Sequence, residues 1–220
     1  MDSMYILLIY RKKMCYKKII DRKGSLKYQN ADISKSLLGV INYYNSNEIA
    51  EAMKMKYALA AVGFISEDIG YNKAILANTL RKCAGKADVV IFGEAFLQGF
   101  SGINFSVDHD RAVSVSREDA LIHEICAAAR ENFIAVSFGF IEKDGEAFFS
   151  SQITLDKHGR IIDLYRRVSP GWKEAFAGKA YREGSGFHTF DFLGKKAAVG
   201  LCGDLWYEEN ISRLNDLNPD

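Results

Sequence analysis

Two apolar runs of strand length, separated by one amphipathic helical segment, constrain the fold more than any other feature of this sequence. Residues 57–65 read YALAAVGFI and residues 87–96 read ADVVIFGEAF. Between them, residues 72–84 place apolar side chains three and four positions apart, and Gly85 follows where such a helix would end. This strand–helix–strand unit predicts two parallel strands in a sheet that is covered on both faces.

Further helices and strands follow in alternation. The segment Ser116-x-x-Asp119 resembles a capping box and predicts that a helix begins there. Residues 133–142 and 146–156 flank an Asp–Gly turn, so they predict a β-hairpin, and residues 161–167 predict one more strand.

The last third of the chain adds a second hairpin, because residues 187–192 and 196–204 flank a Gly–Lys turn. With 48% hydrophobic residues and a net charge of +1, the composition excludes an intrinsically disordered chain. Helices and strands share one layered body, and the sequence therefore predicts an α/β domain over residues 55–220.

The first 54 residues differ from this body in charge. Residues 1–56 contain eleven Lys and Arg against five Asp and Glu, including the run Arg11–Lys18. No Arg-rich helix or aromatic stacking motif accompanies that charge, so we expect no nucleic-acid binding. We interpret residues 1–54 as a poorly ordered basic extension; translation from Met53 or Met55 is the alternative.

Cysteine usage and hydropathy bear on the compartment. The four cysteines lie far apart in the sequence without a C-x-x-C pair, which favours a reducing cytoplasm over a disulfide framework. The longest apolar run near the N-terminus, Tyr5–Tyr10, is too short for a membrane span or a signal-peptide core. We therefore predict a cytoplasmic protein that neither enters nor binds a membrane.

Cys202 is the most suggestive single residue. It ends the apolar run AAVGL and is followed by Gly203 and Asp204, so a strand would deliver it into a tight turn. An ionised thiol on such a support is a nucleophile. The alternative is a buried cysteine that acts as a small hydrophobic residue, which is how we interpret Cys83 and Cys126.

A nucleophilic thiol needs a base, and Glu94 is a better candidate than any histidine. Glu94 follows the apolar residues VVIF, where partial burial would raise its pKa and suit it to proton transfer. The alternative is a strand-end glutamate that faces water. No histidine follows Cys202, and neither the histidines nor the cysteines have the spacing of a metal site, so we expect no metal. The four histidines are His109, His123, His158 and His188.

A pair of arginines is the third candidate component of the site. Arg166 and Arg167 follow Tyr165 at the end of a predicted strand and precede a Pro–Gly loop. A fixed cation beside a thiol lowers the thiol pKa and stabilises the oxyanion of a tetrahedral intermediate. The alternative is a solvated basic strand end.

In combination and order, the segments VVIFGE, YRRVSP and GLCGD resemble the nitrilase superfamily of carbon–nitrogen hydrolases, over about Met55 to Asp220. The resemblance implies that Glu94 is the general base and Cys202 the nucleophile, with a lysine between them in the chain. Glu174 matches a second, positioning glutamate of many members. The family implies an αββα sandwich, pairing into homodimers, and no cofactor or metal.

The implied reaction is hydrolysis of a non-peptide carbon–nitrogen bond through a cysteine thioester. We favour a small-molecule amide or carbamoyl compound over a nitrile as the substrate. The alternative is a catalytically inactive nitrilase-like remnant or binding protein.

Two departures from the family pattern bear on activity. The lysine position is Arg167, and arginine is planar, bulkier and never deprotonated; nearby Lys173 is the second candidate for the cation. In addition, only 18 residues follow Cys202, whereas family members continue with further strands and helices. We therefore expect a sandwich that is incomplete at its C-terminus and a truncated gene product.

Overall fold

A computed structural model describes four parts of the chain, which are residues 10–11, 14–20, 26–30 and 55–220. The three upstream segments form an antiparallel sheet of their own, in the order β1–β2–β3. These strands are β1 (Tyr10–Arg11), β2 (Met14–Ile20) and β3 (Leu26–Asn30). The expectation of a poorly ordered extension over residues 1–54 falls mostly outside the described residues and stays a prediction.

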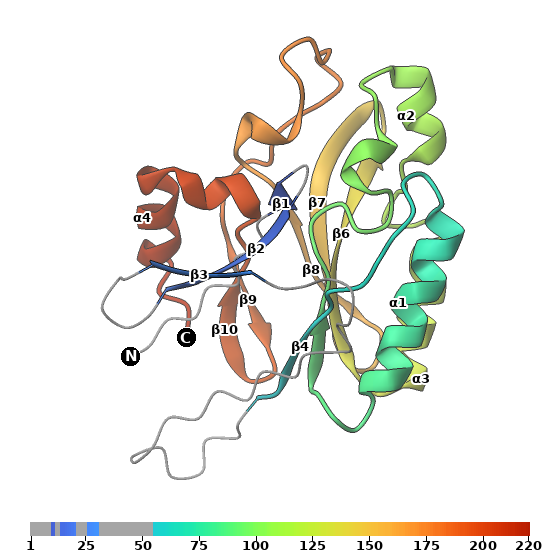
Figure 1. The fold of residues 1–220 in the computed structure, drawn as a ribbon, viewed down its shortest axis with the longest axis vertical. Helices are drawn as coiled ribbons and strands as arrows, with labels where there is room; N and C mark the ends of the chain where they lie inside the picture. Colours follow the sequence, from blue (N-terminus) through green and yellow to red (C-terminus); the bar gives the residue numbers. More distant parts are fainter. Residues whose placement is uncertain (1–9, 12–13, 21–25, 31–54) are drawn as a thin grey trace.

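The main sheet has five strands in sequence order, β4–β5–β6–β7–β8 (Figure 1). β4, β5 and β6 are parallel, whereas β6, β7 and β8 are joined as antiparallel hairpins. The predicted parallel pair and the predicted first hairpin are therefore confirmed. The strands are β4 (Tyr57–Leu59), β5 (Val89–Ile91), β6 (Ala135–Asp144), β7 (Ala147–Leu155) and β8 (Ile161–Arg166).

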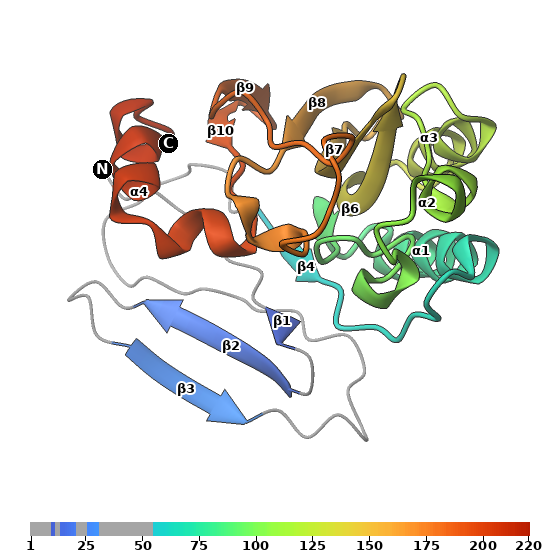
Figure 2. The same cartoon turned by 90° about the horizontal axis from the view of Figure 1, so that it is seen from above.

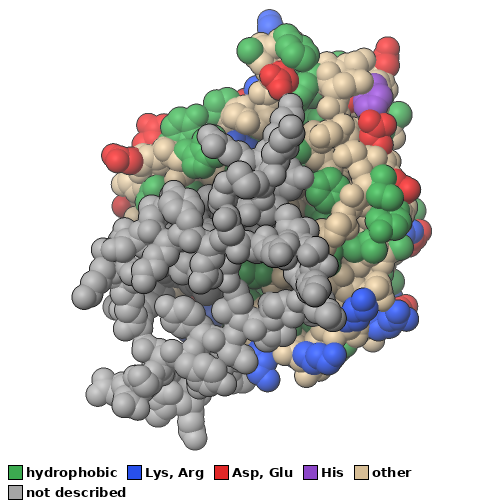
Figure 3. Space-filling view, viewed as in Figure 1, with side chains coloured by type: hydrophobic (Ala, Val, Ile, Leu, Met, Phe, Trp, Pro, Cys, Tyr) green, Lys and Arg blue, Asp and Glu red, His purple; other side chains and the backbone are tan. Residues whose placement is uncertain are grey.

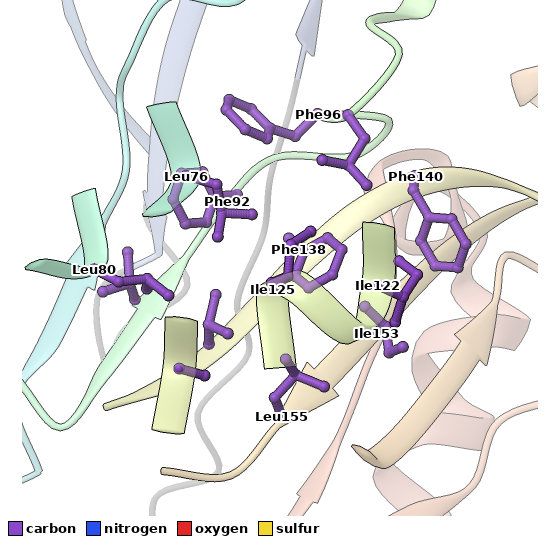
Figure 4. Packing of buried hydrophobic residues seen from close by; sticks show 14 of the residues in the cluster. Leu76, Leu80, Phe92, Phe96, Ile122, Ile125, Phe138, Phe140, Ile153 and Leu155 are labelled. Carbon is purple, nitrogen blue, oxygen red and sulfur yellow. The ribbon is translucent and has the colours of Figure 1, made fainter. Parts of the chain in front are cut away.

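Helices α1 (Ile69–Cys83) and α3 (Ala120–Glu131) cover one face of this sheet (Figures 1 and 2). The apolar face predicted for the first of them packs into the main core, with Leu76 and Leu80 fully buried. Figure 4 shows Leu76 beside Phe92, the residue that follows β5. Burial of such side chains is the dominant favourable term in folding. The short helix α2 (Val107–Val113) precedes α3.

The start of α3 corrects the predicted cap. Asp119, not Ser116, is the N-cap residue, because its side chain accepts the amide of Leu121. Ser116 instead accepts the Asp119 amide through its backbone carbonyl. The helix therefore begins three residues later than a capping box at Ser116 would place it.

A second, two-stranded sheet lies on the other face of the main sheet. It is the predicted second hairpin, formed by β9 (Thr189–Phe192) and β10 (Lys195–Ala198). Phe192 and Leu193 pack against the inner residues of the central strands. Helix α4 (Glu208–Asp216) lies beyond this sheet, as Figure 2 shows. The layers follow helix, sheet, sheet, helix, which confirms the predicted αββα architecture.

Several strands are shorter than predicted. β4 ends at Leu59 rather than at residue 65, because the amide and carbonyl of Ile65 bond to the side chain of Asn72 in α1 instead of to a strand. β5 ends at Ile91 and β10 at Ala198, so Glu94 and Cys202 lie in the segments that follow these strands.

Within the described part of the chain, no helix combines the length and apolar character that crossing a bilayer requires. On the face seen in Figure 3, side chains of both charge signs lie along the margin of the described residues. The expectations of a cytoplasmic location and of no binding to nucleic acid or membranes stay predictions.

Candidate active site

Glu94 and Arg167 form a buried ion pair beyond the ends of β5 and β8. The Arg167 Nη1 atom lies 2.9 Å from Glu94 Oε1 and 3.3 Å from Oε2, and each side chain is only 2% exposed. Glu94 is delivered by the segment after β5, and Arg167 directly follows β8. The structure therefore brings two of the three principal predicted site residues into contact, although their chain positions are far apart.

Two serine hydroxyl groups add hydrogen bonds to this pair. Ser150 on β7 donates to Glu94 Oε1 at 2.6 Å, and Arg167 Nε donates to Ser169 Oγ at 2.7 Å. The amide of Arg167 also bonds to the carbonyl of Ser150 at 2.9 Å. A buried ion pair offsets its desolvation only when its remaining donors and acceptors are satisfied, and these serines serve that purpose.

The guanidinium group of Arg167 also lies against the backbone next to Cys202. A Cβ atom built on Gly203 would lie 2.2 Å from Arg167 Nη2, and one built on Gly171 would lie 3.3 Å from it. Since glycine has no Cβ, Gly203 permits this close approach. The cation therefore spans the space between the Glu94 carboxylate and the turn that holds the thiol.

Cys202 itself has an unusual backbone conformation. It is the first residue of the 3₁₀ helix Cys202–Trp206, it is 6% exposed, and its φ is 41°. The left-handed region costs a non-glycine residue about 1–3 kcal/mol, persists where surrounding contacts fix it, and recurs at active sites. This conformation agrees with the predicted tight turn, although a coil segment rather than a strand delivers the thiol.

Asp204, two residues on, ties this turn to the neighbouring strand. Its fully buried carboxylate accepts hydrogen bonds from Tyr165 Oη at 2.6 Å and from the amides of Leu201, Val168 and Ser169 at 2.9, 3.2 and 2.7 Å. The sequence pattern places Asp204 in the turn, directly after Cys202–Gly203, and carries no signal of these distant partners.

Lys173, the second candidate for the cation, is engaged elsewhere. Its Nζ atom donates to the carbonyl of Tyr181 at 2.8 Å and lies 2.6 Å from Glu183 Oε1. Glu174 is exposed, and its backbone carbonyl accepts the amide of Ala177. The structure thus brings Arg167 rather than Lys173 to Glu94, and it does not place Glu174 in the buried pair. The roles of all five residues stay predictions.

Cys83 and Cys126 lie in or against the main core. Cys83 is fully buried and Cys126 is partly buried, and burial raises the pKa of both thiols. Both thiols are therefore poor nucleophiles near neutral pH. Within the described residues, no three His, Cys, Asp or Glu side chains gather closely enough to hold a metal ion; the expectation of no metal stays a prediction.

His188 lies outside this site and pairs with Asp163 instead. Its Nε2 atom is 2.6 Å from Asp163 Oδ1, and the contact joins β8 to the segment before β9. Burial raises the pKa of the Asp163 carboxyl group, and the hydrogen bond to His188 opposes that shift. His188 therefore links the two sheets rather than acting on the thiol.

Comparison with known proteins identifies the family. The sequence profile of the carbon-nitrogen hydrolase family matches residues 36–218, and thus begins upstream of the predicted domain start at residue 55. The bromoxynil-specific nitrilase of Klebsiella pneumoniae subsp. ozaenae is 28% identical over 146 residues, which cover 61% of this chain and 40% of that protein. An (R)-stereoselective amidase of a Pseudomonas species is 25% identical over 166 residues, which cover 76% and 58%.

The chain spans about half the length of the curated relatives it matches. Among solved structures, an amidase from a Nesterenkonia species aligns with a TM-score of 0.60 and 19% identity, over 76% of this chain and 62% of that one. At this identity the likeness shows the fold alone. The family profile spans most of the sequence, and the chain therefore belongs to the carbon-nitrogen hydrolase family, within the nitrilase superfamily.

Proposed function

We propose that this chain hydrolyses a non-peptide carbon–nitrogen bond, with Cys202 as nucleophile, Glu94 as general base and Arg167 as the cation that stabilises the oxyanion. One observation carries the proposal. The Arg167 guanidinium contacts the Glu94 carboxylate on one side and lies against Gly203, next to the thiol, on the other. An acid–base group and a fixed positive charge thus lie together, against the backbone of the turn that contains Cys202, and acyl transfer to sulfur requires these groups beside a thiol.

The reaction proceeds in two halves. Glu94 removes the proton from Cys202 Sγ as the sulfur attacks the carbonyl carbon, and the carbonyl oxygen takes up the negative charge. Glu94 then returns the proton to the substrate nitrogen, the carbon–nitrogen bond breaks, and ammonia or an amine leaves a thioester. A water molecule gives its proton to Glu94 and attacks the thioester carbon. The carbon–sulfur bond then breaks, Glu94 returns the proton to the sulfur, and the acid leaves.

Arg167 supports these steps through charge rather than proton transfer. Arginine stays protonated at every physiological pH and presents several donors in a rigid plane. Glu94 and Ser169 occupy Nη1 and Nε, so Nη2, which lies against Gly203, is the donor nearest the turn of the thiol. We assign the oxyanion to this nitrogen.

We propose a small amide or carbamoyl compound as the substrate. The site holds one carboxylate that serves in turn as base and acid, and protonation of a leaving nitrogen is needed for an amide. The similarity to the Pseudomonas amidase supports this choice, whereas the similarity to the Klebsiella enzyme keeps nitriles as the second substrate class to test.

Site-resolved alkylation of the full chain tests the proposal. We expect iodoacetamide to modify Cys202 much faster than Cys83 or Cys126, as measured by peptide mass spectrometry over a pH series. Glu94→Gln removes the base and is expected to slow Cys202 modification by about a hundredfold, because general-base assistance is commonly worth 10²–10⁴.

The chain offers a matched control for that variant. Glu142 is also buried, pairs with Arg166 at 2.6 Å and accepts a hydrogen bond from Ser151 at 2.6 Å. Glu142→Gln therefore disrupts an equivalent ion pair away from the thiol, and we expect it to leave Cys202 reactivity near the wild-type rate. Equal, slow modification of Cys83, Cys126 and Cys202 in the wild-type chain contradicts the proposal.

The second candidate is a binding protein without turnover. The observation that favours it is the arginine at the lysine position, held by both oxygens of the base. Release of ammonia from short aliphatic amides separates the two candidates, since an inactive binding protein releases none even where Cys202 is selectively alkylated.

A further inference from the structure

We infer that Asp204 is a positioning residue: its carboxylate ties the turn of Cys202 to the segment of Arg167 and so fixes where the sulfur lies relative to the guanidinium group. The inference deepens the proposed function and rests on it. Asp204 acts through the backbone on either side of the site rather than on the reacting atoms or the substrate.

On the side of the thiol, Asp204 closes the turn that contains Cys202. The Leu201 amide donates to Asp204 Oδ2 at 2.9 Å, and the Asp204 amide donates to the Leu201 carbonyl at 2.8 Å. These two hydrogen bonds span Cys202, whose left-handed conformation needs such support. The carbonyl of Asp204 also accepts from Asn210 Nδ2 at 3.1 Å, which joins the turn to α4.

On the side of the cation, the same carboxylate binds the segment after β8. Its Oδ1 atom accepts the amides of Ser169 at 2.7 Å and Val168 at 3.2 Å. Ser169 also accepts from Arg167 Nε through its hydroxyl group. Ser169 thus connects Asp204 to the guanidinium group of Arg167. A shift of Asp204 would therefore move both the turn of Cys202 and the segment of Arg167.

Tyr165 completes the arrangement from within β8. It is 1% exposed, and its hydroxyl group donates to Asp204 Oδ2 at 2.6 Å. Burial, together with the negative charge of Asp204, raises the pKa of Tyr165 well above its ordinary value, so the phenol keeps its proton and stays a donor. All four groups around the carboxylate are therefore donors.

An asparagine cannot replace this carboxylate. Its NH₂ group would face donors on one side, because each oxygen of Asp204 accepts two hydrogen bonds. Loss of those contacts frees the turn, and a displacement of about 1 Å at a reacting group costs up to a hundredfold in rate.

The test compares Asp204→Asn and Tyr165→Phe with the wild-type full chain in the alkylation experiment. We expect Asp204→Asn to slow Cys202 modification by about tenfold and to move the midpoint of its pH profile upward, because the sulfur moves away from Arg167. Tyr165→Phe removes one donor and is expected to shift both quantities in the same direction by less.

The pH profile separates positioning from a simple charge effect. Removal of a negative charge beside a thiol favours the thiolate and would lower the midpoint, which is opposite to the effect expected here. A midpoint in Asp204→Asn that is unchanged or lower therefore overturns the inference. If Asp204→Asn does not fold, an unchanged or lower midpoint of the pH profile in Tyr165→Phe overturns the inference.

Asp110 supplies the matched control. It is fully buried and accepts from Tyr181 Oη at 2.7 Å and from the amides of Asn104 and Phe105 at 3.1 and 2.9 Å. We expect Asp110→Asn to leave the Cys202 profile unchanged, and an equal shift in this variant contradicts the inference. Wild-type Cys202 that reacts no faster than Cys83 overturns the proposed function instead, so the two failures are distinguishable.

Discussion

At the scale of single residues, the arginine at the family's lysine position fits because two residues next to its guanidinium group are glycines. Gly203 and Gly171 have no side chains, and a Cβ atom on Gly203 would collide with Arg167 Nη2. A guanidinium group is longer and flatter than an ammonium group, and these glycines leave it the space that it needs. The substitution is therefore compatible with a closed, hydrogen-bonded site.

The comparison of Arg167→Ala with Lys173→Ala tests which residue is the cation. We expect Arg167→Ala to lower the rate of amide hydrolysis by about a hundredfold, since loss of one oxyanion donor costs about 10²–10³. Lys173 bonds to Tyr181 and Glu183, so Lys173→Ala should leave the rate within about threefold of wild type. Initial rates of ammonia release measure both.

Arg167→Ala leaves Glu94 buried without its partner, which costs about 3–5 kcal/mol of stability. Arg167→Lys keeps the charge and serves as the second variant, with urea unfolding to show that each protein is folded under assay conditions. Unchanged rates in a folded Arg167→Ala protein would rule out Arg167 as the cation.

The site residues that the sequence predicts differ in their local sequence context from those that only the structure reveals. Cys202 and Glu94 follow apolar runs and match a family pattern, and Arg167 stands at that pattern's lysine position, so these positions are predictable from the sequence. Ser150 and Asp204 are not, because a hydroxyl within a strand or a carboxylate within a turn has many local uses. Their significance lies in partners that are 56 and 39 positions away, Glu94 and Tyr165.

At the scale of elements, the site depends on a close crossing between β6 and the segment after β5. A Cβ atom on Gly139 would lie 2.6 Å from the Cα of Glu94 and 2.5 Å from the amide nitrogen of Ala95. The two segments also exchange backbone hydrogen bonds, from Gly139 to Gly93 and from Leu97 to Gly139. The position of Glu94 is thus set by a strand that contributes no side chain to the ion pair.

Gly139→Ala tests this dependence. The added methyl group meets backbone atoms that cannot rotate away, so we expect a loss of about 1–3 kcal/mol in unfolding free energy. Because the strain falls on the backbone of Glu94, we also expect a lower rate of Cys202 alkylation. Urea unfolding and site-resolved alkylation measure the two effects.

Gly63 is the control for this substitution, since a Cβ atom there meets nothing within 4 Å and its φ is not positive. Gly63→Ala is expected to change neither quantity appreciably. Normal stability and reactivity in Gly139→Ala would show that the segment after β5 adjusts freely and that β6 does not position the base.

The elements that were predicted well are those with a regular period. The helix at residues 72–84 and both hairpins are defined by spacing and turn residues, and they appear as α1, β6–β7 and β9–β10. The strand ends were not predictable, because apolar side chains continue beyond the last strand pairing into the core. Phe92, Phe96 and Leu97 all follow β5 and are buried, so hydrophobicity alone does not mark where that strand stops.

At the scale of the whole molecule, the two sheets differ in burial although both contribute to the site. Every residue of β5 and β7 is buried, whereas no residue of β9 or β10 is. Contacts between the sheets are made by a few side chains such as Phe192 and Leu193, and by the pair His188–Asp163. Cys202 thus follows a strand of the less buried sheet, and Glu94 follows a strand of the more buried sheet.

Hydrogen exchange of the full chain should show this difference as unequal local stability. Amides in β5, β6 and β7 are expected to exchange slowest. Those in β9, β10 and α4 should exchange at least about tenfold faster after correction for intrinsic rates, because regions with few buried apolar contacts open at lower free energy.

The two helices α1 and α4 provide an internal comparison between elements of the same kind. α1 buries Leu76, Leu80 and Cys83 among others, whereas α4 buries only Asn210 and Leu214. Equal protection of α1 and α4 would mean that the two sheets unfold as one cooperative unit. Faster exchange of α4 would mean instead that α4 opens while the main sheet stays folded, and Asp204 bonds to both parts, through Asn210 of α4 and through the amides of Val168 and Ser169.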